Sequence, residues 1–228
     1  MDFYVNYSSY LRRQRFSAFS PFVNAMSYKD YFSEEQLKDY EVVSEWNSFY
    51  EKLTKGEPPQ RIYTSKYITN KIFALEVDIK LTVDCREDFT FKNCYFEKGI
   101  TFKGSKFQKK FWMIDCIVKG ALSTFDSPSF ARGLLIINSS VEQILIFKGS
   151  YGESRWDIKN VSKLSISGGV FTDLNISLKG KIGHIGIIAN QVEGDIFIDG
   201  SNQVVQSINL SGTAKKCHFS STTSKFHI

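Results

Sequence analysis

Apolar residues recur at about every eleventh position from Phe89 onward, and this repeat limits the fold more than any other feature of the chain. The segment Phe89-Thr-Phe-Lys-Asn93 is followed eleven residues later by Ile100-Thr-Phe-Lys-Gly104. Each unit is apolar at its first and third positions and ends in Asn, Asp or Gly. Alternation with a period of two predicts a short strand with one buried face, and the last residue favours a turn.

Two columns of apolar residues can be followed to Phe219, in steps of eight to twelve residues. The first column is predicted at Phe89, Ile100, Phe111, Leu122, Leu134, Leu145, Trp156, Leu164, Leu174, Ile185, Ile196, Ile208 and Cys217. The second is predicted at Phe91, Phe102, Met113, Phe125, Ile136, Phe147, Ile158, Ile166, Ile176, Ile187, Ile198, Leu210 and Phe219. A third, shorter column is predicted at Phe96, Phe107, Val118 and Val141.

One short strand cannot bury its own apolar face, but a series of strands can if the chain winds and equivalent strands stack. Matching turn residues lie 22 or 23 residues apart and indicate the size of one coil. They form two interleaved series, Asn93, Asp115, Asn138, Asn160 and Gly104, Asp126, Gly149. We therefore predict a mainly β fold, a right-handed parallel β-helix with about 22 residues and two repeats per coil. In such a coil Cys94 stacks on Cys116, and Asp173 stacks on Asp195.

The stretch from Phe89 to Phe107 resembles degenerate pentapeptide-repeat proteins, in which Phe or Leu recurs every five or six residues around a square β-helix. The strict five-residue spacing of that family is absent, and the likeness weakens after residue 120. The segment Gly194-Asp-Ile-Phe-Ile-Asp-Gly200 fits the β-helices of bactofilin-type scaffolds equally well. Both resemblances imply a β-helix without catalysis, and neither assigns a functional residue. A leucine-rich repeat is the structural alternative, because its period is also near 22 residues.

Residues 1–60 are predicted to form an N-terminal arm and an amphipathic capping helix over about 34–54. Ser33 and Gln36 make a capping-box pair, and Gly56 and Pro58 end the helical pattern. An open solenoid end exposes apolar faces and strand edges, so we expect this helix to cover the first coil. A partner-binding helix is the alternative.

Residues 61–88 are predicted to be lead-in strands, and residues 89–228 to be the β-helix itself. The clearest strand of the lead-in part runs from Leu75 to Val83, where apolar and charged or polar residues alternate. This strand should lead into the first coil or belong to it.

Two groups of basic residues beside aromatic residues are candidate binding sites. The first 30 residues contain Arg12, Arg13 and Arg15 interleaved with aromatic residues, among them Tyr4, Tyr7, Tyr10, Phe16, Phe19 and Phe22. This composition suits nucleic acid or a membrane interface, and the alternative is an arm packed on the solenoid. The second group lies beside Phe107 and Phe111 and comprises Lys103, Lys106, Lys109, Lys110 and Trp112. It suits phosphate contacts, and the alternative is a solvated face.

The search for catalytic chemistry finds little in this sequence. His184, His218 and His227 are scattered, and no Gly-rich phosphate loop precedes a helix. The four cysteines Cys85, Cys94, Cys116 and Cys217 form no CxxC pair, so we expect buried apolar residues in a reducing compartment. We predict no metal and no cofactor. Stacked carboxylates at Asp173 and Asp195 leave a carbohydrate-active enzyme as a minor alternative.

These features predict a cytoplasmic, non-enzymatic β-solenoid that presents a regular surface to a macromolecular partner, as a binding or scaffolding module. Protein binding or self-association into an oligomer is expected, with Trp156 and the N-terminal arm as further contact points. Binding to nucleic acid or to an anionic membrane surface is the alternative, since the net charge is +5. The first residues lack an apolar h-region and carry an acid at Asp2, so we expect no signal peptide, and the absence of an apolar run of 18 residues predicts no transmembrane segment.

Overall fold

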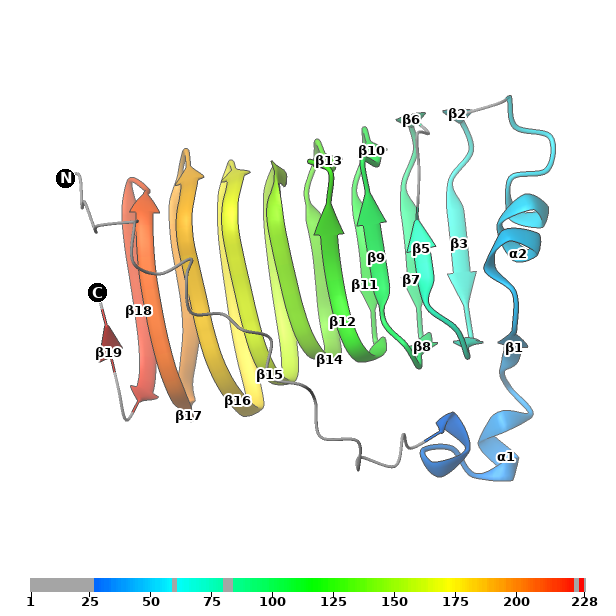
Figure 1. Ribbon diagram of the computed structural model, residues 1–228, viewed down its shortest axis with the longest axis horizontal. Coiled ribbons are helices and arrows are strands. Elements are labelled where there is room, and N and C mark those ends of the chain that lie inside the picture. The colour runs from blue at the N-terminus through cyan, green and yellow to red at the C-terminus, as the bar shows by residue number, and fades with distance from the viewer. Residues whose placement is uncertain (1–26, 59–60, 80–83, 224–225, 228) are drawn as a thin grey trace, which may run out of the picture.

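The computed structural model describes residues 27–58, 61–79, 84–223 and 226–227 (Figure 1). The described chain winds into a parallel β-solenoid of about seven turns, with about 22 residues per coil. Each pairing between described strands is parallel, and equivalent strands of successive coils lie side by side. The predicted parallel β-helix is confirmed, and its interior is one continuous apolar core.

Four stacks of short strands build the first coils. One stack holds β2 (Arg61–Ile62), β6 (Asp84–Cys85), β10 (Lys106–Phe107) and β13 (Ser129–Phe130). The next holds β3 (Lys66–Thr69), β7 (Phe89–Lys92), β11 (Phe111–Ile114) and the start of β14 (Leu134–Ser150). The third holds β1 (Glu41–Val43), β4 (Lys71–Phe73), β8 (Tyr95–Phe96) and the start of β12 (Ile117–Phe125). The fourth holds β5 (Val77–Ile79), β9 (Ile100–Lys103) and the end of β12.

Later coils are wound from long strands that bend around the corners without a break (Figure 1). These strands are β15 (Glu153–Phe171), β16 (Asp173–Val192), β17 (Asp195–Thr213), β18 (Lys216–Thr223) and the short β19 (Phe226–His227). Because β2 to β5 pair in register with β6 to β9, the lead-in segment is itself a coil of the solenoid. Of the strand expected from Leu75 to Val83, Val77–Ile79 is formed, and residues 80–83 lie outside the described part.

The inward columns are formed as predicted at most described positions, and the third column at Phe96, Phe107, Val118 and Val141 is buried. In β14 the predicted alternation is wrong, because Ile144 and Ile146 point inward while Leu145 and Phe147 point outward. Ile144 pairs with Leu122 of the preceding coil, which keeps the step at 22 residues. The segment is apolar in both alternations, so the pattern alone could not select the buried face.

Phe125 and Trp156 also differ from their predicted places. Phe125 is 42% exposed, and Thr124 points inward in its place and is hydrogen-bonded to Tyr151. Trp156 is fully buried in the second column, where it pairs with Ile136. Its predicted role as a surface contact is therefore wrong.

Aromatic rings stack along one inner corner of the solenoid. The rings belong, coil by coil, to Phe107, Phe130, Tyr151 and Phe171. Their successive centroids are 5.0, 5.6 and 4.9 Å apart, and the ring planes differ by 10° to 20°. The spacing of stacked strands, about 4.8 Å, places equivalent rings at the distance that offset stacking favours.

The predicted corner residues adopt a left-handed backbone. The angle φ lies between 51° and 54° at Asn70, Asn93, Asp115, Asn138 and Asn160. Side chains also connect the corners of neighbouring coils: Asn93 Nδ2 donates to Asn70 Oδ1 at 2.9 Å, and Asn138 Nδ2 donates to Asp115 Oδ1. Asn and Asp tolerate this conformation better than other residues with a side chain.

The residue after four left-handed corners, those at Asn93, Gly104, Asp115 and Asn138, points inward and carries a small donor. Cys94, Ser105, Cys116 and Ser139 each donate to the carbonyl two residues earlier and to a carbonyl of the preceding coil. Cys94 and Cys116 are stacked as predicted, and the main-chain N–H of Ile117 donates to the carbonyl of Cys94. The interpretation of the buried cysteines as merely apolar is thus incomplete.

Burial raises the pKa of the Cys116 thiol, which therefore stays a protonated donor. Cys85, Cys94 and Cys116 are buried as expected, but Cys217 is exposed. Cys217 holds an inward position in β18, and within the described chain β18 pairs with β17 on one side only.

The predicted helix over 34–54 is interrupted. Its capping box is formed, but α1 (Glu34–Leu37) is short, and β1 separates it from α2 (Trp46–Leu53). The segment Glu41–Val43 instead pairs with β4, where strand hydrogen bonds replace helical ones. α2 covers the first coil as expected, since Trp46 and Phe49 pack against Phe73 at centroid distances of 5.9 and 5.6 Å. A short η1 (Tyr28–Asp30) precedes α1.

We expect Phe130→Ala to lower the free energy of unfolding by about 3–5 kcal/mol, because it leaves a cavity inside the aromatic stack. Phe125→Ala removes the same ring from an outward position and should cost under about 1 kcal/mol. Urea unfolding followed by circular dichroism measures both values. Equal losses would contradict the outward placement of Phe125.

The left-handed corner at Asn138 can be tested by two replacements. Asn138→Ala and Asn138→Gly both remove the contact with Asp115, but only glycine accepts this φ without strain. The alanine variant should therefore be about 1–2 kcal/mol less stable than the glycine variant in urea unfolding. An alanine variant as stable as the glycine variant would rule out backbone strain at this corner.

Candidate functional site

The predicted lysine group is divided between different sides of the solenoid. Lys103 pairs with Phe125 in register on the outer face of β9 and β12, and its Nζ lies 2.8 Å from Asp78 Oδ2. This hydrogen bond raises the pKa of Lys103. Lys106 lies on the corner strand β10, whereas Lys109 and Lys110 lie in the turn that leads into β11. The structure does not bring these lysines together into one basic face.

Trp112 is the candidate residue that the structure places in an apolar outer patch. Its chain neighbours in β11 point inward, so its ring lies on the outer face. In register, Trp112 pairs with Leu135, and Ile114 pairs with Ile137. Trp112, Ile114 and Ile137 are half-buried, and Leu135 is buried despite its outward position. We name these four residues the Trp112 surface.

Positive side chains surround the Trp112 surface. Lys110 Nζ lies 5.4 Å from the centroid of the Trp112 ring, a distance that permits a cation–π contact. Exposed Lys92 pairs in register with Ile114, and exposed Arg155 pairs with Leu135. Outward positions of a solvated sheet face are ordinarily polar, so a central apolar patch with a cationic rim favours contact with another molecule.

The other predicted site residues, the N-terminal arginines and the aspartate pair, do not form a candidate site in the described structure. Arg12, Arg13 and Arg15 lie outside the described residues. Asp173 and Asp195 are stacked in neighbouring coils as predicted, but Asp173 Oδ1 accepts the main-chain N–H of Asp195 at 3.0 Å. This bond indicates that Asp173 stabilises a turn rather than acting as part of an acid–base pair.

Within the described part of the chain, no group of His, Cys, Asp and Glu residues is arranged to hold a metal ion. None of the helices in the described segments is long and apolar enough to span a membrane. The prediction that the protein needs no metal or cofactor stays a prediction.

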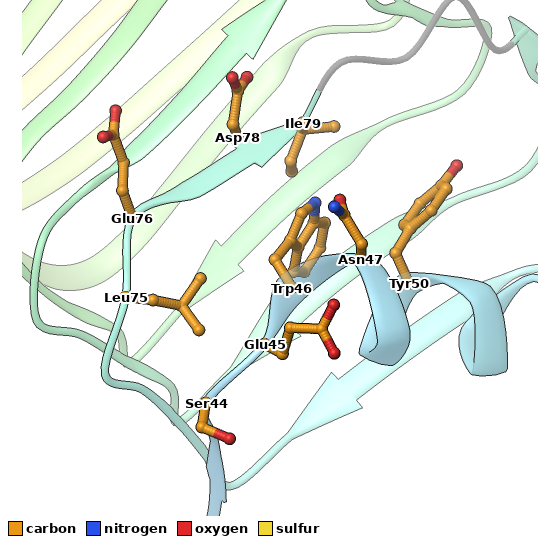
Figure 2. A pocket seen from close by; sticks show the side chains of 9 residues that line it. All are labelled: Ser44, Glu45, Trp46, Asn47, Tyr50, Leu75, Glu76, Asp78 and Ile79. Atoms are coloured by element: carbon orange, nitrogen blue, oxygen red, sulfur yellow. The ribbon is translucent and has the colours of Figure 1, made fainter.

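A cavity of about 410 Å³ lies beside the capping helix, between α2 and β5 (Figure 2). Its lining comes from two segments about 30 residues apart in sequence, and it consists of Ser44, Glu45, Trp46, Asn47, Tyr50, Leu75, Glu76, Asp78 and Ile79. Three of these residues, Glu45, Glu76 and Asp78, carry carboxylates, and the ammonium of Lys103 bonds to Asp78. The alternation from Leu75 onward predicts that Glu76 and Asp78 point outward, but no signal in the sequence places Glu45 opposite them.

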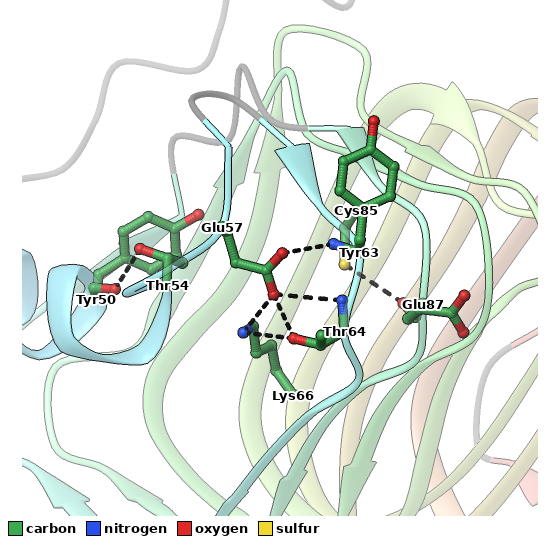
Figure 3. Close-up of polar contacts among 8 residues, drawn as sticks. All are labelled: Tyr50, Thr54, Glu57, Tyr63, Thr64, Lys66, Cys85 and Glu87. Atoms are coloured by element: carbon green, nitrogen blue, oxygen red, sulfur yellow. Dashed lines mark hydrogen bonds and ion pairs between the residues drawn. The ribbon is translucent and has the colours of Figure 1, made fainter.

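A polar network joins the end of α2 to the first coil (Figure 3). Lys66 holds an inward position equivalent to Phe89, and its Nζ lies 2.8 Å from Glu57 Oε1. The same carboxylate accepts the main-chain N–H groups of Tyr63 and Thr64 at 3.0 and 3.3 Å. These bonds, led by the one from Lys66, lower the pKa of Glu57 to about 2. The network gives Lys66, which lies at the end of the core, its hydrogen-bond partners, and its role is therefore structural.

Stability should depend on pH through Glu57. A carboxyl with a lowered pKa stabilises the fold above its ordinary value near 4.5, and this contribution is lost as pH falls toward 2. Glu57→Gln should therefore cost about 1–3 kcal/mol at pH 6 and much less at pH 2.5. Urea unfolding at both pH values measures the difference, with exposed Glu51→Gln as the control. A cost that is the same at both pH values would exclude this role.

No protein-family model, no curated protein and no solved structure matches this chain. The resemblance to pentapeptide-repeat proteins and bactofilin-type scaffolds therefore rests on residues alone. Functional inference has to start from the geometry of the solenoid surface.

Proposed function

We propose that this protein is a non-catalytic scaffold that binds another protein through the Trp112 surface. One observation supports the proposal most strongly: four apolar side chains occupy outward positions on two adjacent strands, β11 and β14. These side chains have no role in the interior, which is filled by the inward side chains of the same strands. A flat parallel face holds them in fixed positions, so a partner meets a pre-formed surface.

The composition of the surface supports a protein partner in particular. A central Trp with neighbouring Leu and Ile, bordered by Lys and Arg, matches the apolar centre and polar rim of protein interfaces. Nucleic acid binding needs a continuous row of phosphate contacts. Lys103 is engaged with Asp78, and Lys106 lies on a corner, so the predicted lysine group does not form such a row.

Trp112→Ala tests this function. We expect it to remove the captured partner in affinity purification from the source cells, because loss of a central Trp typically weakens binding about 30-fold or more. Tyr67→Ala is the matched control, since Tyr67 lies on the same outer column in β3 and is 60% exposed.

Light scattering of the purified variants extends the test to self-association. A partner or an oligomer that survives Trp112→Ala would overturn the proposal. Binding to single-stranded nucleic acid that weakens steeply with salt and depends on Lys109 and Lys110 would favour a nucleic-acid function instead.

A further inference from the structure

A second cavity, of about 350 Å³, lies where the segment before β1 meets the corners of the first coils. It is lined by Phe32, Gln36, Asp39, Tyr40, Asn70 and Asn93. The lining combines two aromatic rings, three side-chain amides and one carboxylate. It contains no histidine, cysteine or cationic side chain, and it shares no residue with the Trp112 surface.

The row of corner side chains ends at this cavity with an amide that the fold does not use fully. Asn93 Nδ2 donates to Asn70 Oδ1, the corner of the preceding coil, at 2.9 Å. Because Glu41 pairs with Lys71, Tyr40 holds the corner position that precedes Asn70. The Tyr40 hydroxyl instead donates to Asn93 Oδ1 at 2.8 Å. The NH₂ group of Asn70 therefore has no acceptor within the described segments, although its oxygen is engaged.

Gln36 and Asp39 complete the polar wall of the cavity. The capping box engages Gln36 Oε1, which accepts the main-chain N–H of Ser33 at 2.9 Å. This bond fixes the orientation of the Gln36 amide, and its NH₂ group has no acceptor among the described residues. The carboxylate of Asp39 likewise makes no hydrogen bond or ion pair in the described part of the chain. The cavity thus offers two oriented amide donors and one acceptor.

These groups select the chemistry of a ligand by elimination. Asp39 repels an anion, and the NH₂ groups of Asn70 and Gln36 have no lone pair to offer to a cation. A hydroxyl group suits the whole wall, because it accepts from an amide and donates to a carboxylate. The rings of Phe32 and Tyr40, with centroids 4.9 Å apart, add an apolar wall. A pyranose ring carries neighbouring hydroxyls on its edge and C–H groups on its face.

We propose that this cavity binds the pyranose ring of a neutral carbohydrate. Neighbouring hydroxyls of the sugar accept from Asn70 and Gln36, and one of them donates to Asp39. The C–H face of the sugar packs against Phe32 and Tyr40. The volume of about 350 Å³ is at the small end of ligand cavities, which fits a single sugar ring. The site binds without catalysis, and its test is independent of the Trp112 surface.

Nuclear magnetic resonance of the full chain, labelled with ¹⁵N, tests the proposal with three methyl pyranosides, those of glucose, mannose and galactose. Cyclohexanol is the control probe, since its ring carries a single hydroxyl. We expect at least one glycoside, at millimolar concentration, to move the side-chain NH₂ signals of Asn70 and Gln36. It should bind about ten-fold more tightly than cyclohexanol, because it makes more hydrogen bonds.

Two isosteric variants assign these signals and test the contacts. Gln36→Glu and Asn70→Asp each remove one NH₂ group but keep the oxygen that accepts within the fold. Each should weaken binding of the glycoside about five- to ten-fold, through the lost hydrogen bond. Gln143→Glu adds the same charge on β14, outside the cavity, and should leave binding unchanged. Circular dichroism checks that all three variants are folded.

The proposal is wrong if none of the three glycosides moves the two NH₂ signals, or if cyclohexanol binds as tightly as the glycosides. Unchanged binding by Gln36→Glu and Asn70→Asp would also overturn it, as would an equal loss of binding in Gln143→Glu.

Discussion

Every coil depends on a corner at which one residue adopts a left-handed backbone. This turn redirects the strand, and after four of the corners the next residue points inward and its thiol or hydroxyl bonds to carbonyls of its own coil and the preceding one. The corner therefore fixes both the direction of the chain and the distance between coils. The stacked rings of the core follow from that distance, since they repeat at the spacing of the strands.

The solenoid can be predicted well from the sequence because strands and corners are marked by different residue types. Apolar alternation marks the strands, and Asn, Asp or Gly marks the corners, so the two signals support each other. The prediction of the buried face or of the element type is wrong where one of these patterns does not distinguish between the alternatives. Around Ile144 both alternations are apolar, and only pairing with Leu122 selects the buried one. The helical pattern near Val43 is overridden because the edge of β4 offers that segment strand hydrogen bonds.

A candidate site residue could likewise be placed from the sequence only where it lies on a regular strand. Trp112 could be identified from its sequence neighbourhood, since it lies between inward residues of a regular strand. The lysine group could not be placed, because a shift of three residues moves a side chain from a face to a corner, as Lys103 and Lys106 show. The cavity beside α2 was beyond prediction, because it exists only once Glu45 and Trp46 are packed against β5.

The regular register between neighbouring coils has a consequence for how this chain can vary. A coil contacts its two neighbours through equivalent positions, so adding or removing a whole coil leaves every remaining contact of the same kind. A one-residue shift within a strand instead turns the inward side chains of that strand toward water, and the coils accommodate differences in length where the register between neighbouring strands shifts. The length of the solenoid can therefore change by whole coils, and duplication of one coil is the simplest way for such a protein to become longer.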